Sequence, residues 1–163
     1  RMATLVMGMW VWPLVVLWHE LGHYVSARWF GITVLRVFVF QEVGRLRLFS
    51  LRFGNTLFGV GLIPTSGYTL LDGLEPNPLG IEHPGMFHLA PQWQRALIIL
   101  AGPVFNLLAA LTAWLCSAWL PTALMETVVY LNLFLAFSTL IPLPGTDGNH
   151  LWRLYKGGGI SHL

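Results

Sequence analysis

Three long runs of apolar residues divide the chain into helical and non-helical parts. They predict helices at residues 2–25, 93–120 and 125–143, because a helix needs about 20 residues to cross a hydrocarbon core of about 30 Å. The third run is short by this rule unless it begins as early as residue 125. The first run has no small-residue cleavage site of the kind that follows a signal peptide, so we expect it to be retained.

Between the first two runs the pattern changes to that of β-strands. Residues 34–40 are rich in β-branched and aromatic side chains, and residues 45–48 alternate polar with apolar positions. After a turn at residues 54–55, the apolar stretch 57–64 is too short to span and contains glycine. Such backbone is tolerated at membrane depth only when it is paired or buried in protein, which favours a re-entrant hairpin.

The fold class that follows is an α-helical integral membrane protein. Three transmembrane helices form its core, and a small re-entrant β-hairpin or sheet at residues 32–70 lies between the first and second helix. Four prolines and three glycines mark residues 72–92 as an irregular loop, and residues 147–163 form a C-terminal segment. We expect residues 1–163 to form a single membrane-embedded unit.

Composition supports the lipid bilayer as the main surroundings of this chain. Hydrophobic residues make up 55% and charged residues only 10%, against about 25% charged residues in an ordinary soluble domain. The net charge of +2 is small and its basic residues are dispersed, so nucleic acid is not an expected partner. Since Cys116 is the single cysteine, no disulfide can form within the chain.

The distribution of basic residues predicts the orientation in the membrane. Five arginines lie between the first two runs and Arg95 lies at the start of the second. Two further basic residues follow the third run, whereas the turn at residues 121–127 carries only Glu126. By the positive-inside rule, the central segment and the C-terminus are cytoplasmic. A compact core of this kind fits a multi-pass protein of a prokaryotic plasma membrane.

The pattern H-E-x-x-H occurs inside the first apolar run. His19 and His23 lie one turn apart on one face of a helix, so both imidazoles can reach one zinc ion, while Glu20 can accept a proton from the attacking water. The pattern has only three fixed positions and also occurs by accident. Its place in a membrane segment favours a functional site, because buried ionisable groups are costly there.

A zinc hydrolase needs a third protein ligand. Asp147 stands out because it follows the third run after a segment in which prolines break the helix and can turn the chain back toward the bundle. Asp147 could instead cap the helix that follows it. The full set of candidates is Asp72, Glu75, Glu82, His83, His88, Asp147 and His150.

Several segments together resemble the site-2 protease family of intramembrane zinc metallopeptidases. Three ordered signatures carry the resemblance: residues 19–23 (HELGH), 102–106 (GPVFN) and 142–148 (PLPGTDG). Residues 62–68 (LIPTSGY) are similar to the re-entrant segment of that family, and Gln94-Arg95 is similar to its approach to the second core helix. The match covers nearly the whole chain.

The resemblance implies a function and a set of site residues. One Zn²⁺ would be held by His19, His23 and Asp147, Glu20 would be the general base, and Asn106 would point toward the active site. The substrates would be transmembrane helices of other membrane proteins, cut in regulated intramembrane proteolysis. Asn106 could instead pair with its own helix, for example with the Ile99 carbonyl that Pro103 leaves without its usual donor.

Two features distinguish this chain from the usual family pattern. Thr139 stands where members usually carry asparagine, three residues before Pro142, so the role of that amide is in question. The interval from Asn106 to Asp147 is too short for a PDZ or other accessory domain. The predicted unit is therefore the minimal core.

Two other classes of function remain open from the sequence. The chain could be a zinc-containing membrane protein that binds partners without cutting them, although an intact Glu20 argues against this. It could also be a fragment of a channel or transporter whose polar residues line a pathway. The sequence does not indicate an oligomeric state.

Overall fold

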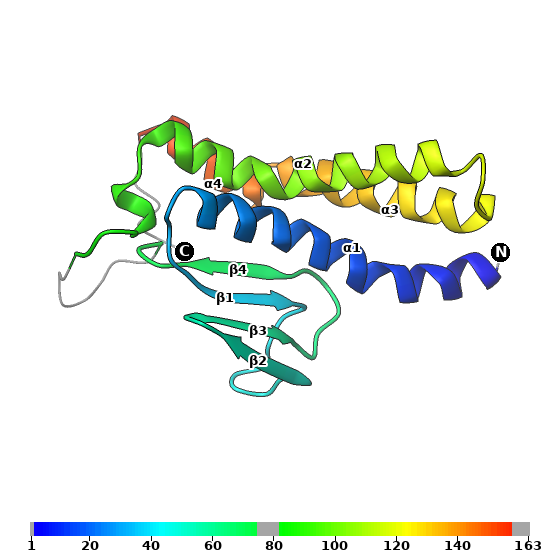
Figure 1. Cartoon of the computed structure of the whole chain (residues 1–163), viewed down its shortest axis with the longest axis horizontal. Helices are drawn as coiled ribbons and strands as arrows, with labels where there is room; N and C mark the ends of the chain where they lie inside the picture. Colours follow the sequence, from blue (N-terminus) through cyan, green and yellow to red (C-terminus); the bar gives the residue numbers. More distant parts are fainter. Residues whose placement is uncertain (1, 75–81, 158–163) are drawn as a thin grey trace.

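A computed structural model describes residues 2–74 and 82–157, with side chains described from Val6 onward. One layer is helical, and a four-stranded sheet lies beside it (Figure 1). The helices are α1 (Met2–Trp29), α2 (Gln92–Cys116), α3 (Thr122–Leu140) and α4 (Asp147–Tyr155). The strands are β1 (Val34–Val39), β2 (Phe49–Phe53), β3 (Thr56–Val60) and β4 (Tyr68–Leu71).

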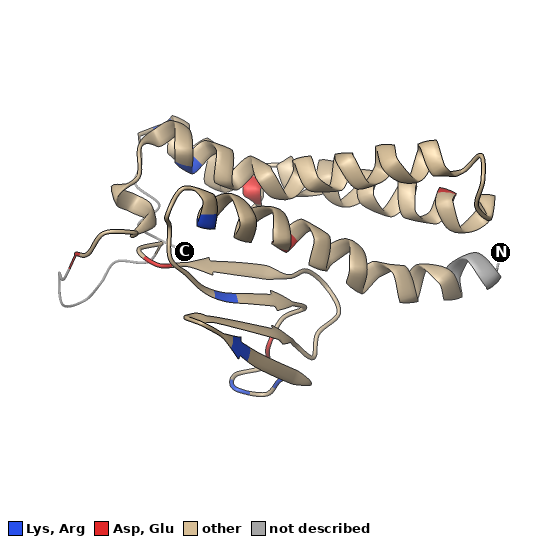
Figure 2. Ribbon diagram, viewed as in Figure 1, with Lys and Arg blue, Asp and Glu red and all other residues tan. Residues whose placement is uncertain are grey.

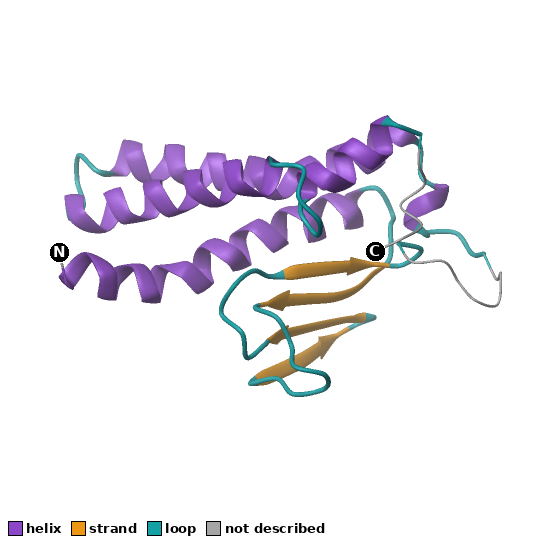
Figure 3. Cartoon of the chain, turned by 180° about the vertical axis from the view of Figure 1, so that it is seen from behind, coloured by secondary structure: helices purple, strands orange, loops and turns teal. Residues whose placement is uncertain are grey.

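α2 runs antiparallel to both α1 and α3 (Figure 1). The three long helices overlap the three predicted apolar runs, but α2 ends at Cys116 and α3 at Leu140, before the predicted ends at residues 120 and 143. α2 and α3 form a hairpin, and α1 packs against both (Figures 1 and 3). A glycine brings α1 and α2 close together, since a Cβ at Gly22 would collide with the backbone of Ala101. Among the described residues, α2 and α3 have the length and hydropathy of membrane spans. The spanning of α1, which is 28 residues long, stays a prediction.

The predicted β-region is a mixed sheet with strand order β2-β3-β1-β4. β1 pairs in parallel with β3 and antiparallel with β4, while β2 and β3 form the hairpin around the predicted turn at Gly54. The hairpin is therefore part of a larger sheet. β4 has one strand partner, β1, among the described residues, which leaves its other edge open.

Two boundaries in the sheet differ from the sequence prediction. The first strand ends at Val39 because Phe40 adopts a positive φ of 74°, which breaks the extended backbone. The predicted strand at residues 45–48 is wrong, since β2 begins at Phe49. A tight turn at Gly44, with φ 63° and backbone hydrogen bonds between Val43 and Leu46, takes up the alternating segment.

Two buried clusters join the sheet to the helices. One connects the C-terminal half of α1, β1, the start of α2 and α4, and the other connects the middle of α1 with β1 and α3. Phe87, in the short 3₁₀ helix η1 (Phe87–Leu89), belongs to the first cluster, so part of the predicted loop 72–92 has regular structure. Residues 75–81 of that loop lie outside the described part of the chain.

Charged side chains are unevenly distributed over the helical layer. Figure 2 shows basic residues at the end of the layer that leads into the sheet and the loop, and a single acidic residue at the opposite end. Large apolar side chains face outward along the helices; the most exposed include Met9, Trp10, Leu14, Trp114, Trp119 and Phe134. The outer surface of this layer is thus apolar, as in proteins surrounded by lipid.

Candidate metal centre

The metal-binding pattern lies in the second half of α1, where the helix faces the rest of the protein. His19, Glu20 and His23 are all buried, although the helix as a whole exposes many apolar residues. Because four residues make about one turn, the two histidines lie above one another on the side that faces α2. The ring centroids are 4.9 Å apart.

The segment between α3 and α4 returns the chain to this place. Gly145, with φ 81°, turns the backbone, and α4 then begins at Asp147. A Cβ at Gly148 would collide with the carbonyl of Leu140, so α4 starts in direct contact with the end of α3. The N-cap is Thr146, whose hydroxyl accepts from the backbone N–H of Asn149. The alternative that Asp147 caps this helix is therefore wrong.

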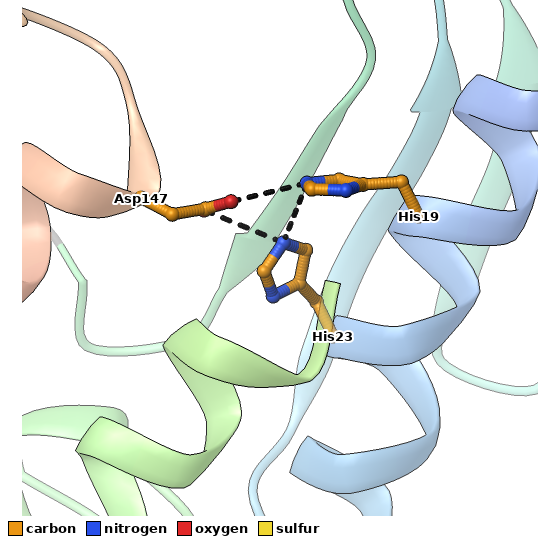
Figure 4. A group of neighbouring side chains, drawn as sticks. All are labelled: His19, His23 and Asp147. Atoms are coloured by element: carbon orange, nitrogen blue, oxygen red, sulfur yellow. Dashed lines mark hydrogen bonds and ion pairs between the residues drawn. The ribbon is translucent and has the colours of Figure 1, made fainter. Parts of the chain in front are cut away.

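His19, His23 and Asp147 converge on one point (Figure 4). Nε2 of His19 lies 3.1 Å from Oδ2 of Asp147, Nε2 of His23 lies 3.4 Å from its Oδ1, and the two Nε2 atoms are 3.3 Å apart. Tetrahedral zinc with bonds of about 2.0–2.2 Å separates its ligand atoms by about 3.3–3.5 Å. The three side chains thus fit three corners of a zinc site.

The surroundings of the histidines match a metal site in two further ways. Nδ1 of His23 lies 2.8 Å from the carbonyl oxygen of Ile98; a carbonyl can only accept, so Nδ1 carries the proton and the Nε2 lone pair is left for a metal. On α2, Gly102 leaves space in front of both imidazoles, where a Cβ would collide with Nε2 of His23 and lie 2.7 Å from Nε2 of His19.

The remaining candidates for the third ligand are placed elsewhere. His83 pairs with Asp72 at 3.1 Å and His88 pairs with Glu82 at 3.1 Å, both in the loop before α2. Glu75 lies outside the described residues. His150 lines the same cavity as the metal cluster but is not one of the three converging groups. Among the described residues, His19, His23 and Asp147 form the one group of three that could hold a metal.

A cavity of about 660 Å³ opens beside the cluster. Glu20 lines it together with both histidines, and the Thr69 hydroxyl donates to Oε2 of Glu20 over 2.7 Å. Gly67 allows β4 to approach, since a Cβ there would lie 2.7 Å from Oε1 of Glu20. The carboxylate is therefore held between α1 and the sheet, within the same cavity as the metal cluster.

The open edge of β4 forms one wall of this cavity. All four residues of β4 line it, and so do Ser66 and Gly67 immediately before the strand. Side chains of a strand alternate between its two faces, so an unbroken run of lining residues means that the edge itself borders the cavity. Backbone groups at that edge are available for pairing with another strand.

Asn106 and Thr139 have different relations to the cavity. Asn106 is fully buried, its amide atoms have no hydrogen-bond partner among the described residues, and it is not among the lining residues. The alternative pairing with the Ile99 carbonyl is therefore not formed. Thr139 does line the cavity, but its hydroxyl donates to the Leu135 carbonyl over 3.0 Å on its own helix.

Local electrostatics favour the ionised form of Asp147 beside the two histidines. Burial raises the pKa of Asp147, but the adjacent His23 and His19 outweigh burial and hold the pKa below its ordinary value. Burial lowers the pKa of His150, so that its imidazole is neutral near pH 7. An ionised carboxylate is the form in which Asp147 binds a metal.

Two contributors to this site were not predicted from the sequence. Gly102 lies within the recognised GPVFN segment, and its closeness to two histidines explains why a residue without a side chain is needed there. Thr69 has no sequence signal, because it is 49 residues from its partner Glu20 and lies in an ordinary strand pattern.

Comparison with known proteins gives one family and a group of relatives. The sequence model of peptidase family M50 matches residues 7–122. A candidate zinc metalloprotease of Thermotoga maritima is 38% identical over 97 residues, which is 58% of this chain and 19% of that protein. A candidate zinc metalloprotease of Brucella suis is 31% identical over 127 residues, covering 65% of this chain and 30% of the relative.

A third relative extends the match along the chain. This candidate zinc metalloprotease of Ralstonia nicotianae is 33% identical over 137 residues, covering 72% of the chain and 27% of the relative. The similarity therefore spans a fifth to a third of the length of these three proteins.

Proposed function

The chain belongs to peptidase family M50, and on that premise we propose that it is an intramembrane zinc metalloprotease that hydrolyses peptide bonds in transmembrane segments of other membrane proteins. One observation carries the proposal. The metal cluster of His19, His23 and Asp147 and the carboxylate of Glu20 line the same cavity, although Asp147 comes from the opposite end of the chain to the other three. This is the arrangement that metal-assisted peptide hydrolysis needs.

The site residues divide the chemistry between them. Zinc held by His19, His23 and Asp147 would activate water and polarise the carbonyl of the scissile bond. Glu20 accepts a proton from the attacking water and transfers it to the nitrogen of the leaving amine as the C–N bond breaks. The Thr69 hydroxyl keeps one oxygen of Glu20 fixed during this transfer. The products are a carboxylic acid and an amine.

The depth of the site supports action within the membrane. His23 lies six residues from the end of α1, or about 9 Å along the helix, and His19 about 15 Å. The apolar run that contains both histidines ends at residue 25, so both would lie within the span, in the part nearer its cytoplasmic end. The exposed apolar surface of the three long helices would face lipid, while Arg28 in the last turn of α1 and Arg95 near the start of α2 would mark the cytoplasmic end of the layer.

The open edge of β4 supports a mode of substrate binding. A peptide bond in a helix is shielded by the helix's own hydrogen bonds, so a transmembrane substrate has to unwind locally before it is cut. An unwound segment could add to β4 as a further strand, which would satisfy its backbone groups and place it along the cavity wall. Substrate preference would then depend on helix instability more than on sequence.

Thr139 supports a second candidate, a zinc protein that binds membrane partners without cutting them. It lines the cavity where related proteases usually carry asparagine, and its hydroxyl is already used by its own helix. The two candidates differ in one measurable respect. The first requires that purified protein cleaves a transmembrane substrate and that Glu20→Gln abolishes cleavage while zinc stays bound, whereas the second requires zinc without cleavage in either protein.

A further inference from the structure

Seven buried side-chain atoms have no hydrogen-bond partner among the described residues. Three of them belong to Arg95, Asn149 and His150. The other four are Nδ1 of His19, both amide atoms of Asn106, and Oδ1 of Asn132. His19, Asn106 and Asn132 are at most 4% exposed and come from α1, α2 and α3 respectively. Buried polar groups in folded proteins are normally paired, so a cluster of unpaired ones needs an explanation.

Asn106 lies at a level of the bundle similar to that of each of the other two residues. Trp18, next to His19, donates its indole N–H to the carbonyl of Phe105, next to Asn106, over 2.8 Å. In the α2–α3 hairpin, Asn106 comes ten residues before the end of α2 and Asn132 ten residues after the start of α3. Residues at equal distances from the turn of an antiparallel helical hairpin lie at a similar height along it.

Asn106 also lies on the side of α2 that faces the histidines. Gly102, one turn before Asn106, is the residue in front of both imidazoles. Residues four apart in a helix share a face, so Asn106 points toward the same side of α1. Its full burial and its absence from the cavity wall place it behind the site, away from any bound substrate.

The four atoms alternate as donors and acceptors. With Nε2 directed at the metal, Nδ1 of His19 carries a proton and can donate, and Oδ1 of Asn106 can accept. Nδ2 of Asn106 can then donate to Oδ1 of Asn132, whose own Nδ2 already donates to the Val128 carbonyl over 2.8 Å. No donor or acceptor of this set is left over.

We propose that Asn106 is a positioning residue that accepts a hydrogen bond from Nδ1 of His19 and is itself oriented by Asn132. We call these two hydrogen bonds the relay. They form when the side chains rotate, or when one water molecule bridges the unpaired atoms, which supply its hydrogen-bond partners. The role of the relay is to fix the tautomer and the ring orientation of a metal ligand. This proposal rests on the metal site of the proposed function, and it can be tested without a substrate.

In this arrangement, each of the two metal-binding histidines donates its Nδ1 proton to an acceptor on α2. His23 is held by the Ile98 carbonyl, whereas Nδ1 of His19 has no such partner until Asn106 supplies one. Outer partners of metal-binding histidines typically change metal affinity about 10–100-fold. If Asn106 only filled space, zinc affinity would not depend on whether residue 106 carries a hydrogen-bond acceptor.

Zinc affinity in detergent, measured by competition with a chelator, tests the relay without any substrate. We expect Asn106→Ala to weaken zinc binding about 10–100-fold and Asn132→Ala to weaken it less. Asn106→Asp keeps an acceptor for Nδ1 of His19 but loses the donor to Asn132, so it should bind zinc more tightly than Asn106→Ala and about as tightly as Asn132→Ala. Thr127→Val is the matched control, because Thr127 is buried in α3 but bonds only its own helix.

A spectroscopic readout separates positioning from folding. With Co²⁺ in place of zinc, the visible absorption spectrum should change in Asn106→Ala, return toward that of the parent in Asn106→Asp, and stay unchanged in Thr127→Val. If Asn106→Ala does not fold, the comparison of Asn106→Asp with Asn132→Ala decides. Zinc binding by Asn106→Asp weaker than by Asn132→Ala, or equal binding by Asn106→Ala and the parent, would overturn the relay.

These outcomes are independent of proteolysis. A parent that binds zinc but cleaves nothing would remove the protease proposal and leave the relay in place. Equal zinc affinity in parent and Asn106→Ala would remove the relay and leave the protease proposal. A parent that binds no zinc would overturn the metal site on which both depend.

Discussion

The hydroxyl of Thr69 donates to the carboxylate of Glu20 over 2.7 Å, linking strand β4 to helix α1 across 49 residues of sequence. The same strand presents its open edge to the cavity that contains the metal cluster. One element therefore orients the proposed general base and borders the space where a substrate strand would lie. Strand β4 would therefore position both the general base and the substrate.

Replacing Thr69 by valine tests this orientation. Valine keeps the shape of the side chain and removes the donor, so we expect kcat to fall about tenfold with little change in KM, because a misoriented base transfers protons less efficiently. Zinc content should be unchanged. Thr69→Ser retains the hydroxyl and should recover most of the activity; a serine variant as slow as the valine variant would contradict the role of this hydrogen bond.

Gly102→Ala tests the close contact between α2 and the histidines. The added Cβ would lie 2.7 Å from Nε2 of His19 and closer to Nε2 of His23. We expect zinc affinity to fall by more than about tenfold, since a misplaced ligand costs at least as much as a lost outer partner. Gly8→Ala in α1 is the control, because a Cβ there meets nothing within 4 Å. Equal zinc affinity in the two variants would rule out this contact as a determinant.

Thr146 and Asp147 are adjacent and can be assigned separate roles by substitution. Thr146→Ala removes the N-cap hydrogen bond and should lower the free energy of unfolding by about 0.5–2 kcal/mol while zinc stays bound. Asp147→Asn should weaken zinc binding by more than about 100-fold, because it replaces a charged ligand. Titration with zinc together with thermal melts distinguishes the two, and zinc binding by Asp147→Asn at parental affinity would exclude Asp147 as a ligand.

Substrate helix stability should control the cleavage rate. If a substrate unwinds and adds to β4, replacing glycines near its cleavage site by leucine should slow cleavage, because the helix then opens less often. Comparing a series of such substrates in detergent gives the dependence. The same rate for stiff and unstable helices would contradict strand addition, and a strict dependence on one side chain would indicate a sequence pocket instead.

The sequence predicted most of the metal site because its information is local. Spacing alone places His19 and His23 on one face of a helix, and the prolines before Asp147 predict a return of the chain. The alternative that Asp147 caps α4 could not be excluded from the sequence, because Thr146 and Asp147 are neighbours with similar capping propensity. Only their positions relative to α4 and the histidines separate the two roles.

Pairings between distant segments could not be predicted. The parallel alignment of β1 with β3 and the placement of β4 at an edge depend on tertiary packing, and no periodicity encodes them. Asn106 shows the same limit: Pro103 suggested a local partner on α2, whereas the fold buries its amide among three helices. The turn at Gly44 displaced a strand whose alternation was otherwise regular.

The most direct test compares the parent with Glu20→Gln in detergent, measuring bound zinc and cleavage of a transmembrane substrate with an unstable helix. We expect about one zinc per chain in both proteins, cleavage by the parent, and a loss of at least about 100-fold in the variant, which keeps its fold and loses the general base. Cleavage by Glu20→Gln at the parental rate, or a parent without zinc, would contradict the proposed metalloprotease.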